Sequence, residues 1–432
     1  MFLLKVTHAA YNPFGSTNSM SGKFYKLTKE IQHNTILNRA TIEVLGADLP
    51  TVATELVGRN WRSAVESGFR ITYYLFNSMI IPTLLMPLIN KISSYKHELP
   101  KAFQKPFLIQ FEDLIPEKKT KEGNKEFVEN LKKTEGAERV KDFFGEDSDL
   151  KHEKINEFKE KMVKAKSLVF RLDSLLSGIL TFFVPWTTEW FSKTFLGVTA
   201  FAGEYDLLDD SQKEESVQFH EKTKIFKFIG GLLITVFGSH WSTNIVNKAV
   251  GSTAESMNGK NFSDKAGRFV RSNLKHFDYY NQIYANRLNL ASTFLFGGDA
   301  GFLLGARTIN EVIERFCRIS VFIPTLIFGI EGANSKFCEW SDKKHGTKTL
   351  DYKSPKELGS RRVKSLEELE EELVLAKNAN NVDQIQNVEK AIKLQSNNYW
   401  KSILASSAVL GVGLTAANIV GTKIRVEKFG IY

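Results

Sequence analysis

A stretch of 20 residues without Asp, Glu, Lys or Arg limits the fold of this chain more than any other feature. It covers residues 71–90 and is bracketed by Arg70 and Lys91. A helix needs about 20 predominantly apolar residues to cross the roughly 30 Å hydrocarbon core of a membrane. The stretch therefore predicts a transmembrane helix over 71–90, in an all-α, multi-helix integral membrane protein.

Two further blocks have the same character. Residues 228–247 carry no formal charge, and residues 402–422 are uncharged between Lys401 and Lys423. They predict transmembrane helices over 226–247 and 402–422. Because the last block is rich in Gly, Ser and Ala, we expect it to pack against a neighbouring helix.

Three other apolar blocks leave alternatives open. Residues 174–204 are nearly uncharged with Pro185 near the middle, which favours a helical hairpin over one long tilted helix. Residues 288–306 are uncharged except for Asp299, and the two glycines before it predict interrupted helices. Residues 319–330 are too few to span and indicate a half-helix or a buried core helix.

The tryptophans support the membrane interpretation, but the basic residues give no orientation. Basic residues flank both the first and the last span on each side, so the positive-inside rule does not choose a topology. The tryptophans lie inside or within about ten residues of an apolar block, as an interfacial belt requires. They are Trp61, Trp186, Trp190, Trp241, Trp340 and Trp400.

Charge between the apolar blocks is mixed. The formal net charge is +9, yet residues 117–166 hold 14 Lys or Arg against 13 Asp or Glu. Interleaved charges are typical of solvated helices, so we expect no nucleic-acid partner. Near the C-terminus, capping patterns at Ser365 and Asn381 precede two apolar periodicities, which predicts a helical hairpin over 363–397.

The remaining segments complete the expected organisation. A basic amphipathic helix over 268–288 is predicted to lie on a membrane surface or on the protein's own polar part. In chain order, the first four regions are a polar and basic N-terminal region at 1–70, the span at 71–90, a charged helical extramembrane region at 91–166 and the hairpin or tilted helix at 167–204. The next four are an acidic loop at 205–225, the span at 226–247, a loop with the basic helix at 248–287 and interrupted apolar helices at 288–330. The last four are a polar linker at 331–362, the hairpin at 363–397, the span at 402–422 and a basic tail at 423–432.

Two residues are candidates for an intramembrane polar site. An ionised carboxylate is costly in hydrocarbon, so Asp299 indicates either ion or proton coupling or a helix cap. His240 stands beside Ser239, but no nearby acid or GxSxG turn accompanies it, and we expect it to mark the interfacial end of its helix with Trp241.

Small residues recur at helix-packing spacing in two places. Gly297, Gly301 and Gly305 form one series, and Gly413, Ala417 and Gly421 form another. Such series let helices approach backbone to backbone. We therefore expect these two faces to make the closest helix contacts of the protein.

The cluster Glu311, Glu314, Arg315 and Arg318 pairs acid and base at i to i+4, which supports a helix. The two arginines could also meet lipid phosphates.

No motif predicts catalysis or a cofactor. Cys317 and Cys338 are the only cysteines, which excludes a disulfide framework and a thiolate zinc cluster. No Walker A sequence is present, and no signal-peptide core begins the chain, so internal spans are expected to direct insertion.

We interpret the chain as a non-enzymatic membrane scaffold in the lipid bilayer, with protein partners at 91–166 and 363–397. The alternatives are a small-solute or ion transporter using the broken helix at Asp299, and a soluble or peripheral helical protein.

Overall fold

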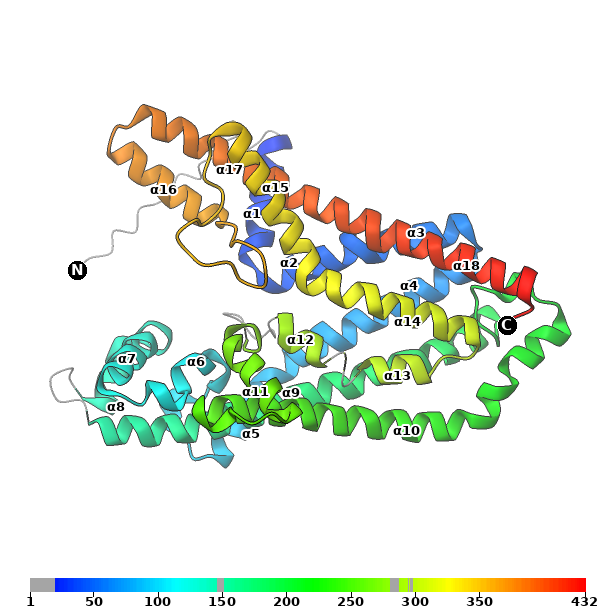
Figure 1. Ribbon diagram of the computed structural model, residues 1–432, viewed down its shortest axis with the longest axis horizontal. Coiled ribbons are helices and arrows are strands. Elements are labelled where there is room, and N and C mark those ends of the chain that lie inside the picture. The colour runs from blue at the N-terminus through cyan, green and yellow to red at the C-terminus, as the bar shows by residue number, and fades with distance from the viewer. Residues whose placement is uncertain (1–19, 146–150, 280–286, 294, 296–297) are drawn as a thin grey trace. The chain divides into compact units, whose positions relative to one another are not determined.

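The computed structural model describes residues 20–145, 151–279, 287–293, 295 and 298–432. It is 83% helical. The described residues contain no β-strand, only two isolated bridges between Leu350 and Val363 and between Glu357 and Ser360. The predicted all-α class is confirmed (Figure 1).

Four helical runs in the described part of the chain are long and apolar enough to cross a membrane. Three of them contain the stretches predicted to span, at 71–90, 226–247 and 402–422. The fourth contains most of the open block at 174–204. The runs are Trp61–Lys96, His152–Leu196, Asp210–Gly251 and Val382–Phe429.

The chain divides into two compact units, and each is discontinuous in sequence. Unit 1 comprises Met1–Ala64 and Arg318–Gly421, and unit 2 comprises Val65–Cys317 and Thr422–Tyr432. Each of the three boundaries between the units falls inside a helix, namely α4 (Trp61–Leu75), α14 (Ile309–Pro324) and α18 (Leu414–Phe429).

Three long helical runs form the centre of unit 2. α4 continues through a π-helical turn at Phe76–Ile80 into α5 (Ile81–Lys96). The 40-residue α9 (His152–Phe191) and the 42-residue α10 (Asp210–Gly251) follow. Figure 1 shows α9 and α10 running alongside each other.

The run α4–α5 lies antiparallel to α9. Asn77 donates from Nδ2 to the carbonyl oxygen of Leu180 at 3.1 Å, and Ser93 donates from Oγ to the carbonyl oxygen of Ala165 at 2.5 Å. As residue numbers rise along α4–α5, the numbers of the residues they contact fall along α9. Consequently most of the uncharged residues 71–90 lie beside the uncharged residues 174–188 of α9.

α10 is antiparallel to α9 in the same way. Arg171 donates from Nη2 to Oδ1 of Asn244 at 3.1 Å, and Lys224 donates to Oε1 of Glu189 at 2.5 Å. These contacts bring the uncharged residues 228–247 beside the same part of α9, so the uncharged segments of all three runs coincide.

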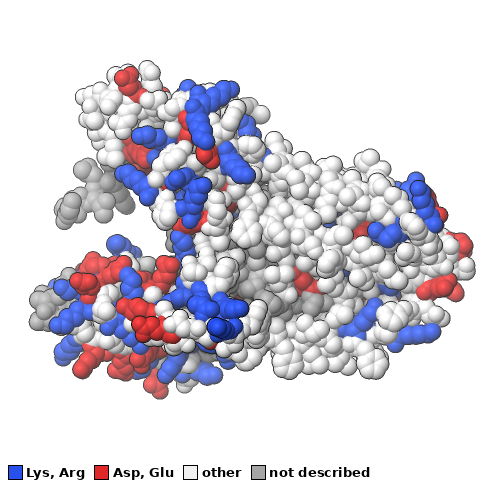
Figure 2. All heavy atoms as spheres, viewed as in Figure 1, with Lys and Arg blue, Asp and Glu red and all other residues white. Residues whose placement is uncertain are grey.

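A charged part of unit 2 packs on the N-terminal half of α9. The rings of Phe103, Phe127 and Phe144 surround Phe158 of α9, with centroid distances of 5.2, 6.1 and 5.3 Å. Figure 2 shows Lys, Arg, Asp and Glu side chains gathered over α7 and α8. The helices of this part are α6 (Phe111–Leu114), α7 (Lys121–Glu135) and α8 (Ala137–Phe144).

Shorter helices complete unit 2. They are α11 (Phe262–Ser272), α12 (Arg287–Thr293), α13 (Asp299–Leu304) and the first part of α14. α13 packs against both α9 and α10.

Unit 1 is also helical. Leu369 and Leu373 of α16 pack with Val388 and Ile392 of α17 and with Tyr25 of α1 in one buried cluster. α17 continues through a π-helical turn at Ser407–Gly413 into α18. The other helices are α1 (Met20–His33), α2 (Thr35–Glu43), α3 (Leu49–Gly58), α15 (Ile330–His345), α16 (Leu366–Asn378) and α17 (Val382–Ser406).

Several sequence predictions are wrong in detail. The favoured hairpin at 174–204 does not form, because α9 continues through Pro185 as a single helix. Proline removes one backbone hydrogen bond, and a long, well-packed helix tolerates that loss. The polar linker at 331–362 begins instead with α15, which ends at Gly346 in the left-handed conformation.

The acidic loop at 205–225 is mostly helix. Asp209 and Gln212 form a capping box, and the acidic residues that follow are favourable at the positive end of the helix dipole. The basic amphipathic helix predicted at 268–288 is α11 instead, which starts earlier and ends at Ser272. Residues 280–286 of that prediction lie outside the described residues.

Candidate functional site: a buried ionic network in unit 2

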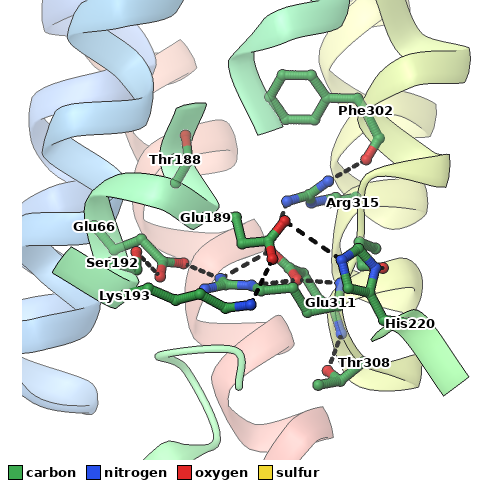
Figure 3. A network of polar contacts seen from close by, with 12 residues as sticks. Glu66, Thr188, Glu189, Ser192, Lys193, His220, Phe302, Thr308, Glu311 and Arg315 are labelled. Atoms are coloured by element: carbon green, nitrogen blue, oxygen red, sulfur yellow. Dashed lines mark hydrogen bonds and ion pairs between the residues drawn. The ribbon is translucent and has the colours of Figure 1, made fainter. Parts of the chain in front are cut away.

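A group of charged side chains is buried where α4, α9, α10 and α14 of unit 2 meet (Figure 3). Glu66, Glu189, Arg307, Glu311 and Arg315 are each at most 8% exposed. A buried ion is tolerated only when it is paired and hydrogen-bonded.

Arg307 is the centre of the network. Its Nη2 lies 2.6 Å from Oε1 of Glu66, and its Nε lies 3.1 Å from Oε2 of Glu311. The backbone N–H of Arg307 also donates to Glu311, at 2.7 Å. One guanidinium therefore joins α4 to the first turn of α14.

Glu311 is shared between two arginines. Arg315, one helical turn later, donates from Nη2 to Oε1 of Glu311 at 2.6 Å and from Nη1 to the carbonyl oxygen of Phe302. The predicted i to i+4 pair is thus present. Because Arg315 is buried among these partners, the suggestion that it meets lipid phosphates is wrong.

Glu189 binds α9 to α10. Lys193 and Lys224 lie 2.8 and 2.5 Å from its Oε1, and Nε2 of His220 lies 3.4 Å from its Oε2. The other ring nitrogen of His220 lies 3.1 Å from the carbonyl oxygen of Ala306. Ser192, one turn after Glu189, donates to Glu66 at 2.6 Å, which connects the two halves of the network.

The loop after α9 adds a further buried carboxyl. Glu204 is fully buried, and its Oε2 accepts a 2.6 Å hydrogen bond from Asn310. Burial raises the pKa of Glu204 to about 7, and the nearby carboxylates of Glu311 and Glu314 add to this shift. Burial therefore favours the protonated form of the Glu204 carboxyl.

Most charges of the network are paired with one another. Its carboxylates are engaged by arginine and lysine, so they are poor bases. No group of three or more His, Cys, Asp or Glu side chains in the described residues is placed to hold a metal ion.

Asp299 lies elsewhere in unit 2, as the first residue of α13. The cap position of that helix is Gly298, which makes no side-chain cap hydrogen bond. Oδ2 of Asp299 is buried without a hydrogen-bond partner. A Cβ added at the neighbouring Gly298 would lie 2.4 Å from Oγ1 of Thr181, which places this turn beside the middle of the uncharged part of α9.

His240 is exposed on α10, far along the helix from the ionic network. Its Nε2 lies 2.9 Å from Nδ2 of Asn244, which is in turn bonded to Arg171.

The first small-residue series faces α9. A Cβ at Gly301 would lie 3.0 Å from the Cα of Phe182, and one at Gly305 would lie 2.7 Å from Cβ of Pro185. Gly297 lies outside the described residues.

The second series behaves differently. Within the described residues, a Cβ at Gly413 would meet only the carbonyl oxygen of Ala408 in its own helical run. The close approach in unit 1 is made instead by Gly411, where a Cβ would lie 2.3 Å from Cβ of Pro50 and 3.0 Å from the carbonyl oxygen of Ala47.

Sequence reasoning missed most of the network. The available signal was that Glu189, Lys193 and Glu204 are the only charges in the block 174–204. Glu66 and Arg307 gave no signal, because a single charged residue near the end of an apolar block is ordinary.

No family model, curated protein or solved structure matches this chain, so the interpretation depends on its own residues.

Proposed function

We propose that this chain is a multi-pass membrane protein that serves as a non-enzymatic scaffold. The observation that carries the proposal is the outward-facing apolar side of α10. Phe226, Ile229, Leu233, Ile234 and Phe237 are between 50% and 80% exposed, although all are large and hydrophobic. Such a surface is costly in water and favourable against acyl chains.

The coincidence of uncharged segments supports the same proposal. Three runs of unit 2, α4–α5, α9 and α10, have uncharged residues side by side, and the uncharged stretches of α4–α5 and α10 each have the 20 residues that a hydrocarbon core requires. The surface over the middle of α10 is free of charged side chains in Figure 2. Trp61, Trp190 and Trp241 are exposed near the ends of these segments, as an interfacial belt requires.

The scaffold role is supported by the ionic network and by the surfaces outside the uncharged zone. The paired charges of the network connect four helices at one end of that zone. Because they are paired, few charged groups remain available for catalysis. The charged region at 91–166 and the helical pair α16–α17 offer polar surfaces for protein partners. We propose that Gly301 and Gly305 provide a GxxxG-type contact with α9, and that α16 and α17 act together as a hairpin.

Membrane insertion can be tested at the two ends of α10. Ser211 and Ser256 are exposed and lie beyond its uncharged part. In a Cys317→Ser, Cys338→Ser background, S211C and S256C should differ in sealed vesicles: a membrane-impermeant maleimide should label one and reach the other only after detergent is added. Equal labelling of both, or release of the protein by alkaline carbonate, would contradict the proposal.

A second candidate function is ion or solute transport past Asp299. It is favoured by the unpartnered buried Oδ2 of Asp299, level with the uncharged part of α9. An interrupted helix at membrane depth is where transporters bind their substrates. Proteoliposomes should then show an ion or proton flux that D299N abolishes, whereas a scaffold should show the same background flux with and without Asp299.

A further inference from the structure

A shallow groove runs along the outward face of α10 in unit 2. It has a volume of about 550 Å³ and is lined at one end by Leu233, Ile234 and Phe237 and at the other by His240, Trp241 and Asn244. The lining runs from Leu233 to Asn244 of one helix, a distance of about 17 Å along its axis. This length matches one leaflet of a bilayer, whose hydrocarbon core is about 30 Å thick.

A cation without an acidic partner lies next to the polar end of the groove. Arg171 of α9 donates to the lining residue Asn244 at 3.1 Å, its Nε has no hydrogen-bond partner, and no carboxylate of the described residues forms an ion pair with its guanidinium. Arg171 stands just before the uncharged part of α9, so it lies at the level where that part begins. A guanidinium in this position lacks the anion that normally accompanies it.

The side chains next to Arg171 favour an anion at the polar end of the groove. Asn244 donates from Nδ2 to Nε2 of His240 at 2.9 Å, which leaves the Nδ1–H of the neutral imidazole as a second donor. The nearby acid Asp264 is neutralised by an ion pair with Lys248. The site therefore offers positive charge and hydrogen-bond donors.

Aromatic rings mark the boundary at the same level. The ring of Trp241 stacks on Phe262 of α11, with centroids 5.7 Å apart and planes at 15°. Phe262 itself is 67% exposed. Amphipathic and aromatic rings of this kind are favoured where acyl chains meet headgroups.

We propose that this groove binds one phospholipid, with its phosphate on Arg171 and His240 and one acyl chain along Leu233, Ile234 and Phe237. The site rests on the proposed membrane insertion of α10. The combination of an apolar groove and a cation at its end favours a lipid over free phosphate, because an inorganic ion makes no contact with the apolar side chains.

The test is a titration of the full-length, delipidated protein in detergent with palmitoyl-oleoyl phosphatidylglycerol, with bound lipid counted by native mass spectrometry. The wild type should retain one lipid, and R171Q should bind it at least tenfold more weakly. I234W, which fills the apolar end, should also weaken binding. K91Q is the matched control, because Lys91 is an exposed cation near the same end of the uncharged zone and outside the groove.

The outcomes separate the possibilities. Equal retention by R171Q and wild type, or an equal loss in K91Q, would overturn the site. Displacement of the lipid by inorganic phosphate at matched concentration would also overturn it. Thermal unfolding checks that R171Q and I234W are folded. Carbonate extraction of the wild type reports on membrane insertion alone, so a failure of that proposal is distinguishable from a failure of the groove.

Discussion

Arg307 and Glu66 are 241 residues apart in the chain, yet their side chains form a 2.6 Å ion pair with both side chains at most 2% exposed. Removal of one member of a buried pair leaves the other charged and unsolvated. The Glu66–Arg307 pair is therefore a place where a single substitution should have a large effect.

We expect R307M to lower the free energy of unfolding by roughly 3–5 kcal/mol, because it removes the ion-pair partner of the buried Glu66 and one of the two arginines that pair with Glu311. The measurement is thermal or denaturant unfolding in detergent. K161M is the control, since Lys161 forms an exposed i to i+4 pair with Glu157 and should change stability by less than about 0.5 kcal/mol. A loss for R307M no larger than that of the control would show that the network does not stabilise unit 2.

Gly301 and Gly230 provide a matched pair for the contact between α13 and α9. G301A should destabilise the protein by about 1–3 kcal/mol, because the new methyl group would lie 3.0 Å from the Cα of Phe182. Nothing lies within 4 Å of a Cβ at Gly230 of α10, so G230A should be neutral or stabilising by up to about 1 kcal/mol. Similar melting temperatures for the two variants would argue against close packing at Gly301.

Glu204 should make stability depend on pH. Its pKa is raised from 4.5 to about 7, so between these values the folded carboxyl keeps its proton while the unfolded one loses it. The free energy of unfolding should therefore fall as pH rises from 4.5 to 7, by up to about 3 kcal/mol, and then level off. The difference between wild type and E204Q isolates this contribution, and parallel pH profiles would refute it.

Asp342 organises the loop after α15 in unit 1. Its carboxylate accepts hydrogen bonds from the backbone N–H groups of Thr349 and Leu350 and from the hydroxyls of Thr347 and Tyr352. In D342A the buried donors of Thr347, Thr349 and Leu350 lose their acceptor, at roughly 1–3 kcal/mol each.

Amide hydrogen exchange at Thr349 and Leu350 should accordingly become at least tenfold faster in D342A. Glu339 lies on the same helix, and its exposed carboxylate forms an ion pair with the exposed Lys343. E339Q should leave both amides protected, and equal exchange in D342A and E339Q would contradict the role given to Asp342.

The two cysteines should differ in reactivity. Cys338 is fully buried, and burial raises the pKa of its thiol to about 11, whereas Cys317 is half-buried. Because the thiolate is the reactive species, maleimide at pH 7.5 should modify Cys338 only after denaturation. Mass spectrometry of tryptic peptides checks this, and modification of Cys338 in the native protein would disprove its burial.

Local patterns predicted the helical class and the positions of three apolar runs, because these depend on composition over about 20 residues. The local patterns failed at Asp210, where acidic residues predicted to form a loop begin a 42-residue helix. They also failed at Pro185, where packing outweighs a local helix breaker. The pair of Glu66 and Arg307 could not be predicted, because no local pattern relates residues so far apart.

The three boundaries between the units, each inside a continuous helix, bear on how the protein is made. Residues 20–58 of unit 1 emerge from the ribosome before the helices that complete their unit, which lie between Arg318 and Gly421. The whole of Val65–Cys317 must be synthesised in the interval. The earlier segment therefore waits for these packing partners until the intervening residues of unit 2 have been made.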